Sequence, residues 1–121
     1  KITLGIHKNI KGKVKKLDSQ NPYDSICCLP HMGWNKISIG DSFLGSEFDK
    51  HFNQYFLHSY AVKDIEESKI LYKCDYAGQT FVAAVKDKNL VGLQFHPERS
   101  GSQGVRILTS LVKLLCREYP S

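Results

Sequence analysis

Apolar and polar residues alternate in short runs along most of the chain, and this pattern is typical of strands. The runs are rich in β-branched and aromatic residues and are bounded by turn formers such as Ala77-Gly78. The segments expected to be extended are residues 14–17, 26–29, 55–62, 70–76, 79–85 and 90–95. Because only the polar run 86–89 separates the last two, they are expected to form a hairpin.

Two segments instead repeat apolar residues at the spacing of a helix. Residues 41–52 form the first, in which Asp41 is placed to cap a turn carrying Phe43, Leu44, Phe48 and Phe52. The second follows residues 100–103, whose Ser-Gly-Ser-Gln sequence fits a capping box. Its predicted core-facing stripe consists of Val105, Leu108, Val112, Leu115 and Tyr119. Strands combined with two helices indicate an α/β or α+β unit.

Composition and charge exclude several functional classes. The 121 residues, 41% of them apolar, suit one domain or part of one, and no run of about 18 apolar residues predicts a membrane span. The net charge is +5, and much of the excess lies early in the chain, at Lys8, Lys11, Lys13, Lys15 and Lys16. No aromatic residue lies between Ile2 and Pro22 to accompany these lysines. The lysines therefore predict a solvated surface and no nucleic-acid partner.

The cysteines show no spacing typical of a disulfide framework or a metal site. Cys28 and His31 form a single C-x-x-H without a second pair to complete four zinc ligands. We expect reduced thiols in a cytoplasmic protein, mostly as small core residues, and no metal at Cys27, Cys28, Cys74 and Cys116.

The sequence His96-Pro97-Glu98 is the strongest candidate for chemistry. Proline fixes its own φ and favours an extended residue before it, so side chains two positions apart project to the same side. A carboxylate beside an imidazole fixes its tautomer and stabilises the imidazolium, as in a catalytic triad. The alternative is a turn at the end of a strand in which His96 and Glu98 meet incidentally.

Three motifs, in order, resemble those of a known family. Residues 91–100 (Val-Gly-Leu-Gln-Phe-His-Pro-Glu-Arg-Ser) are similar to the closing motif of class I glutamine amidotransferases. Residues 29–35 (Leu-Pro-His-Met-Gly-Trp-Asn) and 55–60 (Tyr-Phe-Leu-His-Ser-Tyr) are similar to two further motifs. Within that family, the set is typical of the glutaminase subunits of imidazole glycerol phosphate synthases.

The resemblance implies a fold and a domain organisation. Residues 1–121 would be the C-terminal part of a single flavodoxin-like α/β domain, strand-rich and ending in a helix. The family carries its nucleophilic cysteine on a G-x-C-x-G elbow in the N-terminal half. None of the four cysteines lies in that sequence, so we expect the elbow to be absent and this chain alone to be inactive.

The resemblance also implies an activity. A cysteine thiolate attacks L-glutamine, His96 acts as base and then as acid, and Glu98 orients it, without a cofactor. Ammonia passes to a (β/α)₈ cyclase or synthase subunit, the partner in a heterodimer of histidine biosynthesis. Ser59 and Tyr60 would help hold the substrate glutamine, although His58, the residue directly before them, could simply be a satisfied strand histidine. The loop of residues 30–35 and the residue after Glu98 would face the partner at the ammonia exit, through Pro30, Met32, Trp34, Asn35 and Arg99.

Alternatives remain open at this level. The segment 30–35 could be a tight turn with Trp34 as a core anchor. A paralogous amidotransferase that feeds ammonia to surface-sugar amidination would share these motifs. A non-catalytic module that docks on a synthase would also fit a chain without the nucleophile. A hydrolase using Cys28 is the weakest alternative, because Cys28 lacks the strand-turn-helix context that exposes a nucleophile.

Overall fold

The computed structural model describes residues 2–4, 12–17, 31–41, 51–88 and 90–118, and these form a strand-rich α/β unit that ends in a helix, as predicted. All eight strands of this part of the chain belong to one sheet. The elements are β1 (Ile2–Leu4), β2 (Gly12–Lys16), β3 (His31–Ile39), β4 (His51–His58), β5 (Tyr60–Ile65), η2 (Glu67–Lys69), β6 (Ile70–Tyr76), β7 (Gln79–Asp87), β8 (Leu90–Leu93), η3 (Pro97–Arg99) and α1 (Gly101–Glu118).

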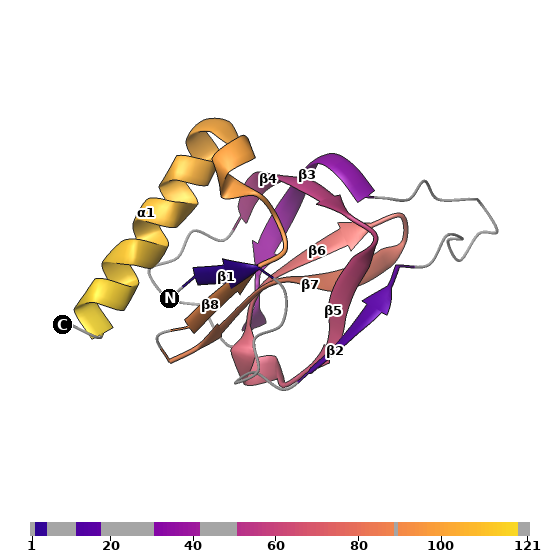
Figure 1. Ribbon diagram of the computed structural model, residues 1–121, viewed down its shortest axis with the longest axis horizontal. Helices are drawn as coiled ribbons and strands as arrows, with labels where there is room; N and C mark the ends of the chain where they lie inside the picture. The colour runs from indigo at the N-terminus through magenta and orange to yellow at the C-terminus, as the bar shows by residue number, and fades with distance from the viewer. Residues whose placement is uncertain (1, 5–11, 18–30, 42–50, 89, 119–121) are drawn as a thin grey trace.

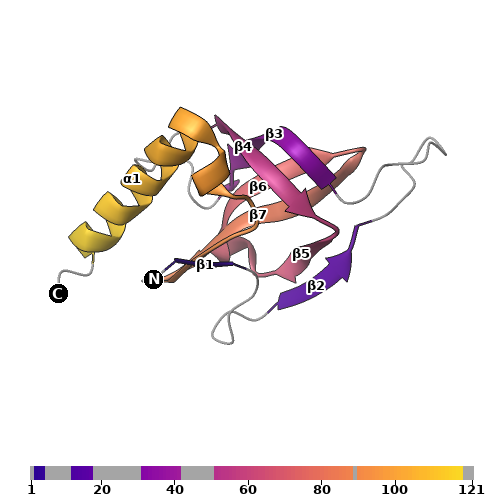
Figure 2. The same cartoon turned by 45° about the horizontal axis from the view of Figure 1, so that its top comes forward.

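The sheet has a main path and a side branch. Its main order is β1-β8-β7-β6-β3-β4, in which β1 and β8 are parallel and the other neighbours are antiparallel. Strands β2 and β5 pair with each other and join β7 through the pair Val62 and Val82. Helix α1 lies at one end of the molecule and the β2–β5 branch at the other (Figures 1 and 2).

The sheet curls so that the segment after β8 reaches β4, although these strands are far apart in the strand order. The main-chain N–H of His96 donates to the carbonyl of Tyr55 in β4, with an N–O distance of 2.9 Å. Large side chains fill the space inside the curl, among them Phe56, Phe81 and Phe95, which are at most 1% exposed. The curl therefore brings the His-Pro-Glu sequence next to a strand that lies about 40 residues earlier in the chain.

Most of the predicted strands are confirmed. The hairpin between β6 and β7 turns through Ala77 and Gly78, whose φ values are 52° and 80°. Two successive positive φ values define the turn type that suits the twist of a two-residue hairpin. The predicted hairpin of the last two strands is the β7–β8 pair, although β7 extends to Asp87 and shortens the turn. The exposed Lys13, Lys15 and Lys16 lie on β2, as expected for a solvated surface.

Two predicted segments differ from the structure. The expected strand 55–62 is divided at Ser59 into β4 and β5, which pair with different neighbours. The expected helix 41–52 ends differently, because Phe52 belongs to β4 and pairs with Ile37. Phenylalanine occurs in helices and in strands, and at Phe52 the pairing with Ile37 of β3 favours the strand. Residues 42–50 of that helix and the expected strand 26–29 lie outside the described residues.

The predicted core-facing stripe of α1 is only partly correct: Leu115 packs against the core as predicted, Tyr119 lies outside the described residues, and the two valines do not face the core. Val105 and Val112 are 64% and 51% exposed, whereas Ile107 and Leu111 are fully buried. Two apolar stripes run side by side on this helix, and periodicity alone does not distinguish between them. The buried stripe begins at Gly104, the position where the helix comes closest to η3.

The predicted capping box also differs. Ser100 does precede the helix, and its carbonyl accepts the N–H of Gly104 at 3.1 Å. The side chain of Gln103, however, accepts a hydrogen bond from the N–H of Asn53 in β4 at 2.6 Å. The polar residues at the start of α1 therefore join the helix to β4.

The contact at Gly104 gives a first testable prediction. A Cβ atom there would lie 2.0 Å from the carbonyl oxygen of Pro97, a main-chain atom that cannot easily move. Gly104→Ala should therefore lower the free energy of unfolding of the full-length protein by about 2 kcal/mol or more. Val105→Ala, on the exposed side of the same turn, is the control and should change it by less than about 0.7 kcal/mol. Equal denaturation midpoints for the two variants would contradict the close approach.

Candidate active site

His96 and Glu98 lie side by side immediately after β8. His96 is extended, with φ −112° and ψ 90°, and Pro97 is the buried first residue of η3. The turn brings Glu98 back against the imidazole, so that His96 Nδ1 and Glu98 Oε1 are 2.8 Å apart. The extended His96 before a proline is as expected, but Glu98 reaches the imidazole through the turn of η3 and not along an extended chain.

Main-chain contacts with β4 hold this pair in place. The carbonyl of Tyr55 accepts the N–H of His96 at 2.9 Å, and the N–H of Tyr55 donates to Ser100 Oγ at 2.8 Å. The Ser100 hydroxyl in turn donates to the carbonyl of His96 at 2.7 Å. We call these three contacts the Tyr55 bracket. Sequence reasoning missed the bracket, since the signals at Ser100, its place in the closing motif and before a helix, say nothing of a contact with Tyr55.

The electrostatics fix which nitrogen of His96 carries the proton. Burial alone would raise the pKa of Glu98, but hydrogen bonds from its own main-chain N–H and from His96 lower it overall. Glu98 is therefore an ionised acceptor at neutral pH, and the Nδ1–H of His96 donates to it. The Nε2 atom of a neutral His96 is then a proton acceptor, on a side chain that is 26% exposed. This is the arrangement of a general base with its orienting carboxylate.

A second histidine pair lies beneath the surface and was not predicted. His31 of β3 and His58 of β4 are cross-strand neighbours, 2% and 9% exposed, with His31 Nδ1 and His58 Nε2 2.9 Å apart. Burial lowers the pKa of His31 to about 4, assisted by the proximity of His58. Burial is also the main cause of the lowered pKa of His58, which lies close enough to His96 to be affected by its charge. Both buried rings are therefore neutral at pH 7.

The two residues expected to hold glutamine lie at the break between β4 and β5. Ser59 is half-buried and its carbonyl accepts the N–H of Leu17 at 2.7 Å. Tyr60 is 57% exposed, and its carbonyl accepts a hydrogen bond from His58 Nδ1 at 2.9 Å. The expectation that His58 could be a satisfied strand histidine is confirmed, because both of its ring nitrogens have partners.

The residues expected at the partner interface do not all gather on one face. Met32, Trp34 and Leu57 are 63%, 57% and 41% exposed on the outer face of β3 and β4, and we call them the β3–β4 patch. Arg99 lies at its border, with its guanidinium carbon 4.7 Å from the centre of the Tyr55 ring. Asn35 is on the opposite face, where its amide nitrogen lies 3.3 Å from His31 Nε2.

Residues 31–35, expected to form a loop or a tight turn, instead begin a strand. The segment from His31 onward is strand β3, so neither the expected loop nor the alternative tight turn is present there. Trp34 is no core anchor, because alternation along the strand places it on the exposed face. Pro30 lies outside the described residues.

Two thiols lie in the described part of the chain. Cys74 is buried, and burial, together with the nearby Asp75, raises the pKa of its thiol to about 12. Such a thiol is inert as a nucleophile at neutral pH. Cys74 is thus a small core residue, as expected for most of the thiols, whereas Cys116 is exposed on α1 because its position falls outside the buried stripe. Cys27 and Cys28 lie outside the described residues.

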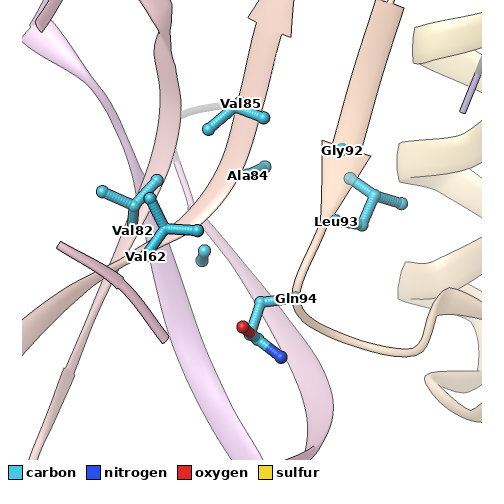
Figure 3. Close-up of a pocket in the computed structure, with 8 residues that line it drawn as sticks. Val62, Val82, Ala84, Val85, Gly92, Leu93 and Gln94 are labelled. Carbon is cyan, nitrogen blue, oxygen red and sulfur yellow. The ribbon is translucent and has the colours of Figure 1, made fainter. Parts of the chain in front are cut away.

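The described residues contain no cluster of three or more metal-binding side chains, and none of their helices is long and apolar enough to cross a membrane. A cavity of about 10 Å³ lies between β5, β7 and the end of β8, lined by Val62, Val82, Leu93, Gln94 and their neighbours (Figure 3). This volume admits one water molecule at most, so the cavity is no substrate site.

Comparisons with known proteins show the family to which the chain is similar. A family model described as glutamine amidotransferase class-I matches residues 26–113. The chain is 48% identical over 90 residues to the imidazole glycerol phosphate synthase subunit HisH of Mannheimia succiniciproducens, covering 72% of this chain and 44% of that protein. It is 36% identical over 110 residues to the subunit HisH of Bacillus subtilis, covering 90% of this chain and 51% of that protein. The chain thus spans about half the length of these curated relatives.

A solved structure shares the fold. It is a Thermoplasma acidophilum protein described as a GMP synthase subunit, which matches with a TM-score of 0.57 at 15% identity. The match covers 88% of this chain and 49% of that one. The likeness supports the predicted α/β class, in which a sheet carries its functional residues at strand ends.

The buried histidine pair predicts how stability depends on pH. Histidines of the unfolded chain take up protons near pH 6.5, whereas folded His31 does so only near pH 4. Acid therefore favours the unfolded state, and the free energy of unfolding should fall as the pH drops from about 6.5 to about 4. Each ring contributes at most about 1.4 kcal/mol per pH unit. Denaturant titrations of the full-length protein across this range measure the slope.

His31→Gln is the matched variant for this measurement, because it keeps a polar side chain but removes one titrating ring. Its stability should depend less steeply on pH between 6.5 and 4 than that of the wild type. A slope equal to that of the wild type would show that His31 is not buried as a neutral ring.

Proposed function

Because the chain belongs to the class-I glutamine amidotransferase family, we propose that it forms the C-terminal part of a cytoplasmic glutaminase subunit. The subunit hydrolyses L-glutamine to glutamate and ammonia. It passes the ammonia to a (β/α)₈ cyclase subunit that makes imidazole glycerol phosphate in histidine biosynthesis. The names of the relatives support this pathway. The observation that carries the proposal is the 2.8 Å contact between His96 and Glu98, which leaves Nε2 of His96 as a base.

In the proposed reaction, the nucleophilic cysteine comes from the other half of the protein. His96 Nε2 removes the thiol proton, and the thiolate attacks the side-chain carbonyl carbon of glutamine. The imidazolium then returns the proton to the departing nitrogen, and ammonia leaves as the thioester forms. A water molecule, deprotonated by the same Nε2, cleaves the thioester to glutamate and restores the thiol. Glu98 keeps its charge throughout and stabilises each imidazolium.

The β3–β4 patch suits the docking surface for the cyclase subunit in this proposal. Exposed apolar residues that adjoin a polar rim are typical of protein interfaces. The patch lies beside the Tyr55 bracket, so a partner docked there would cover the exit from His96. Met32 and Trp34 would then supply an apolar wall that keeps water out of the ammonia path. Pro30 is proposed for the same interface through the segment it belongs to, whereas Asn35, whose side chain lies on the opposite face of β3, is not.

The proton role of His96 gives a direct test. In the full-length protein with its partner, His96→Asn should lower kcat for glutamine hydrolysis by at least about 10²–10⁴-fold, because no other group takes the proton. Glu98→Gln should be milder, since it keeps a hydrogen bond to Nδ1 but loses the charge. Glu66→Gln, an exposed carboxylate away from the site, serves as the control and should be unaffected. Wild-type rates in His96→Asn would remove His96 from the mechanism.

Arg99 is proposed to couple the two reactions. It is exposed, it stacks on Tyr55 at the border of the β3–β4 patch, and it can pair with acidic groups of a docked partner. In Arg99→Ala, glutamine hydrolysis should continue, but glutamine-dependent product formation should fall further, while synthesis from added ammonia stays normal. The ratio of glutamate to final product should therefore rise above one. Both products are measured in one assay of the reconstituted complex.

Arg106→Ala is the matched control for this coupling. Arg106 is also exposed and also lies over an aromatic ring, that of Phe52, at 5.6 Å, but it belongs to the body of α1. The ratio should remain one in this variant. A ratio of one in Arg99→Ala, with both rates unchanged, would show that Arg99 takes no part in coupling.

A further inference from the structure

The buried histidines form one continuous chain of hydrogen bonds across β3, β4 and β5. It runs from Asn35 through His31 and His58 to the carbonyl of Tyr60. Aromatic rings enclose it, with Tyr76 stacked on His31 at 3.9 Å between ring centres and Phe81 against the edge of His58 at 4.8 Å. His31 and His58 are buried, and each of their ring nitrogens has a partner within the protein.

The last acceptor fixes the direction of every bond. A carbonyl can only accept, so His58 Nδ1 carries a proton and donates it to the oxygen of Tyr60. In a neutral ring, His58 Nε2 is then an acceptor, and it receives the Nδ1–H of His31. His31 Nε2 is an acceptor in its turn and receives the amide N–H of Asn35, which also lies 3.2 Å from the carbonyl of Asp75. Both rings therefore hold the proton on Nδ1.

The end of this chain lies where the proposed substrate contacts begin. Ser59 interrupts the strand between β4 and β5, and two bonds fix the break: Leu17 N–H to the carbonyl of Ser59, and His58 to the carbonyl of Tyr60. The same strand β4 carries the Tyr55 bracket that holds His96. A shift of the Ser59–Tyr60 main chain would therefore change its distance from His96 directly.

We propose that His58, oriented by His31 and Asn35, is a positioning residue for glutamine, holding the Ser59–Tyr60 main chain at a fixed place relative to His96. The inference rests on the proposed function, since Ser59 and Tyr60 are the proposed contacts of glutamine. Its consequence is specific: loss of the bond to Tyr60 weakens glutamine binding, whereas the proton chemistry at His96 is retained.

Three substitutions at His58 separate the effects of its two hydrogen bonds, one to Tyr60 and one to His31. Asparagine places an amide nitrogen near the position of Nδ1 and keeps the bond to Tyr60. Glutamine places its amide near Nε2, where the amide oxygen can accept the Nδ1–H of His31 but nothing reaches Tyr60, and leucine keeps neither bond. In the full-length protein with its partner, KM for glutamine should stay within about twofold of wild type for His58→Asn. It should rise about tenfold for His58→Gln and His58→Leu, the effect of one lost hydrogen bond. kcat should change by less than about threefold in all three.

Phe81→Leu is the matched control for a purely structural effect. It removes the ring packed against His58 but leaves the bond to Tyr60 in place, so it should lower stability without raising KM. A rise in KM equal to that of His58→Leu would show that packing, and not the hydrogen bond, positions the substrate contacts.

A measurement on the wild-type protein tests the chain without any variant. Nitrogen NMR of the imidazole rings at pH 7 should show His31 and His58 both neutral, with the proton on Nδ1 and none on Nε2. A proton on Nε2 of His58 would overturn the proposal, because Nδ1 could not then donate to Tyr60.

The kinetic outcomes also distinguish this inference from the proposed function. If the wild-type complex releases no glutamate from glutamine, both the proposed function and the positioning role are wrong. Wild-type turnover combined with the same KM in His58→Asn, His58→Gln and His58→Leu overturns the positioning role alone.

Discussion

The hydrogen bonds at the main chain of Tyr55 are the constraint on which the rest of the site depends. Strand β4 is the last strand of the main path, and the N–H and carbonyl of Tyr55 take partners from outside the sheet, because an unpaired buried main-chain group costs about 1–3 kcal/mol. At Tyr55, the partners come from the segment after β8: the N–H of His96 and the hydroxyl of Ser100. The same two residues flank η3, and Ser100 directly precedes α1. The hydrogen bonds of this one residue of β4 therefore hold the curl of the sheet, the backbone of His96 and the start of the helix in place.

Strands β3 and β4 serve two functions because successive side chains point to opposite faces. His31 and His58 are on the inner face, in contact with the core, and Met32 and Leu57 are on the outer face, one position along. A slip of one residue in the register would exchange these faces and bury the patch while exposing the histidines. The register therefore couples the position of the proposed partner surface to that of the proposed substrate contacts.

Contacts between residues close in the sequence could be predicted, whereas contacts between distant residues could not. The contact of His96 with Glu98 was predicted from three neighbouring residues, since a proline restricts the backbone locally. The strands and the Ala77-Gly78 turn were also predicted from local patterns. The Tyr55 bracket and the histidine pair join residues 45 and 27 positions apart, and no local pattern gives a cross-strand register. The same reason explains the errors at Phe52, Ser59 and the stripe of α1, where a distant neighbour decided between two local patterns.

The burial of two histidines in an aromatic cluster needs a physical reason of its own. Apolar residues of similar shape would stabilise the fold about equally well, because replacing both partners of a buried polar pair often leaves the free energy of unfolding nearly unchanged. Apolar residues would, however, leave the carbonyl of Tyr60 without its donor, and they would not fix the orientation of any group. A chain of neutral rings satisfies every member and gives each bond one direction, from Asn35 to Tyr60. Such a chain specifies one arrangement of the strand break beside His96, which packing alone would leave less defined.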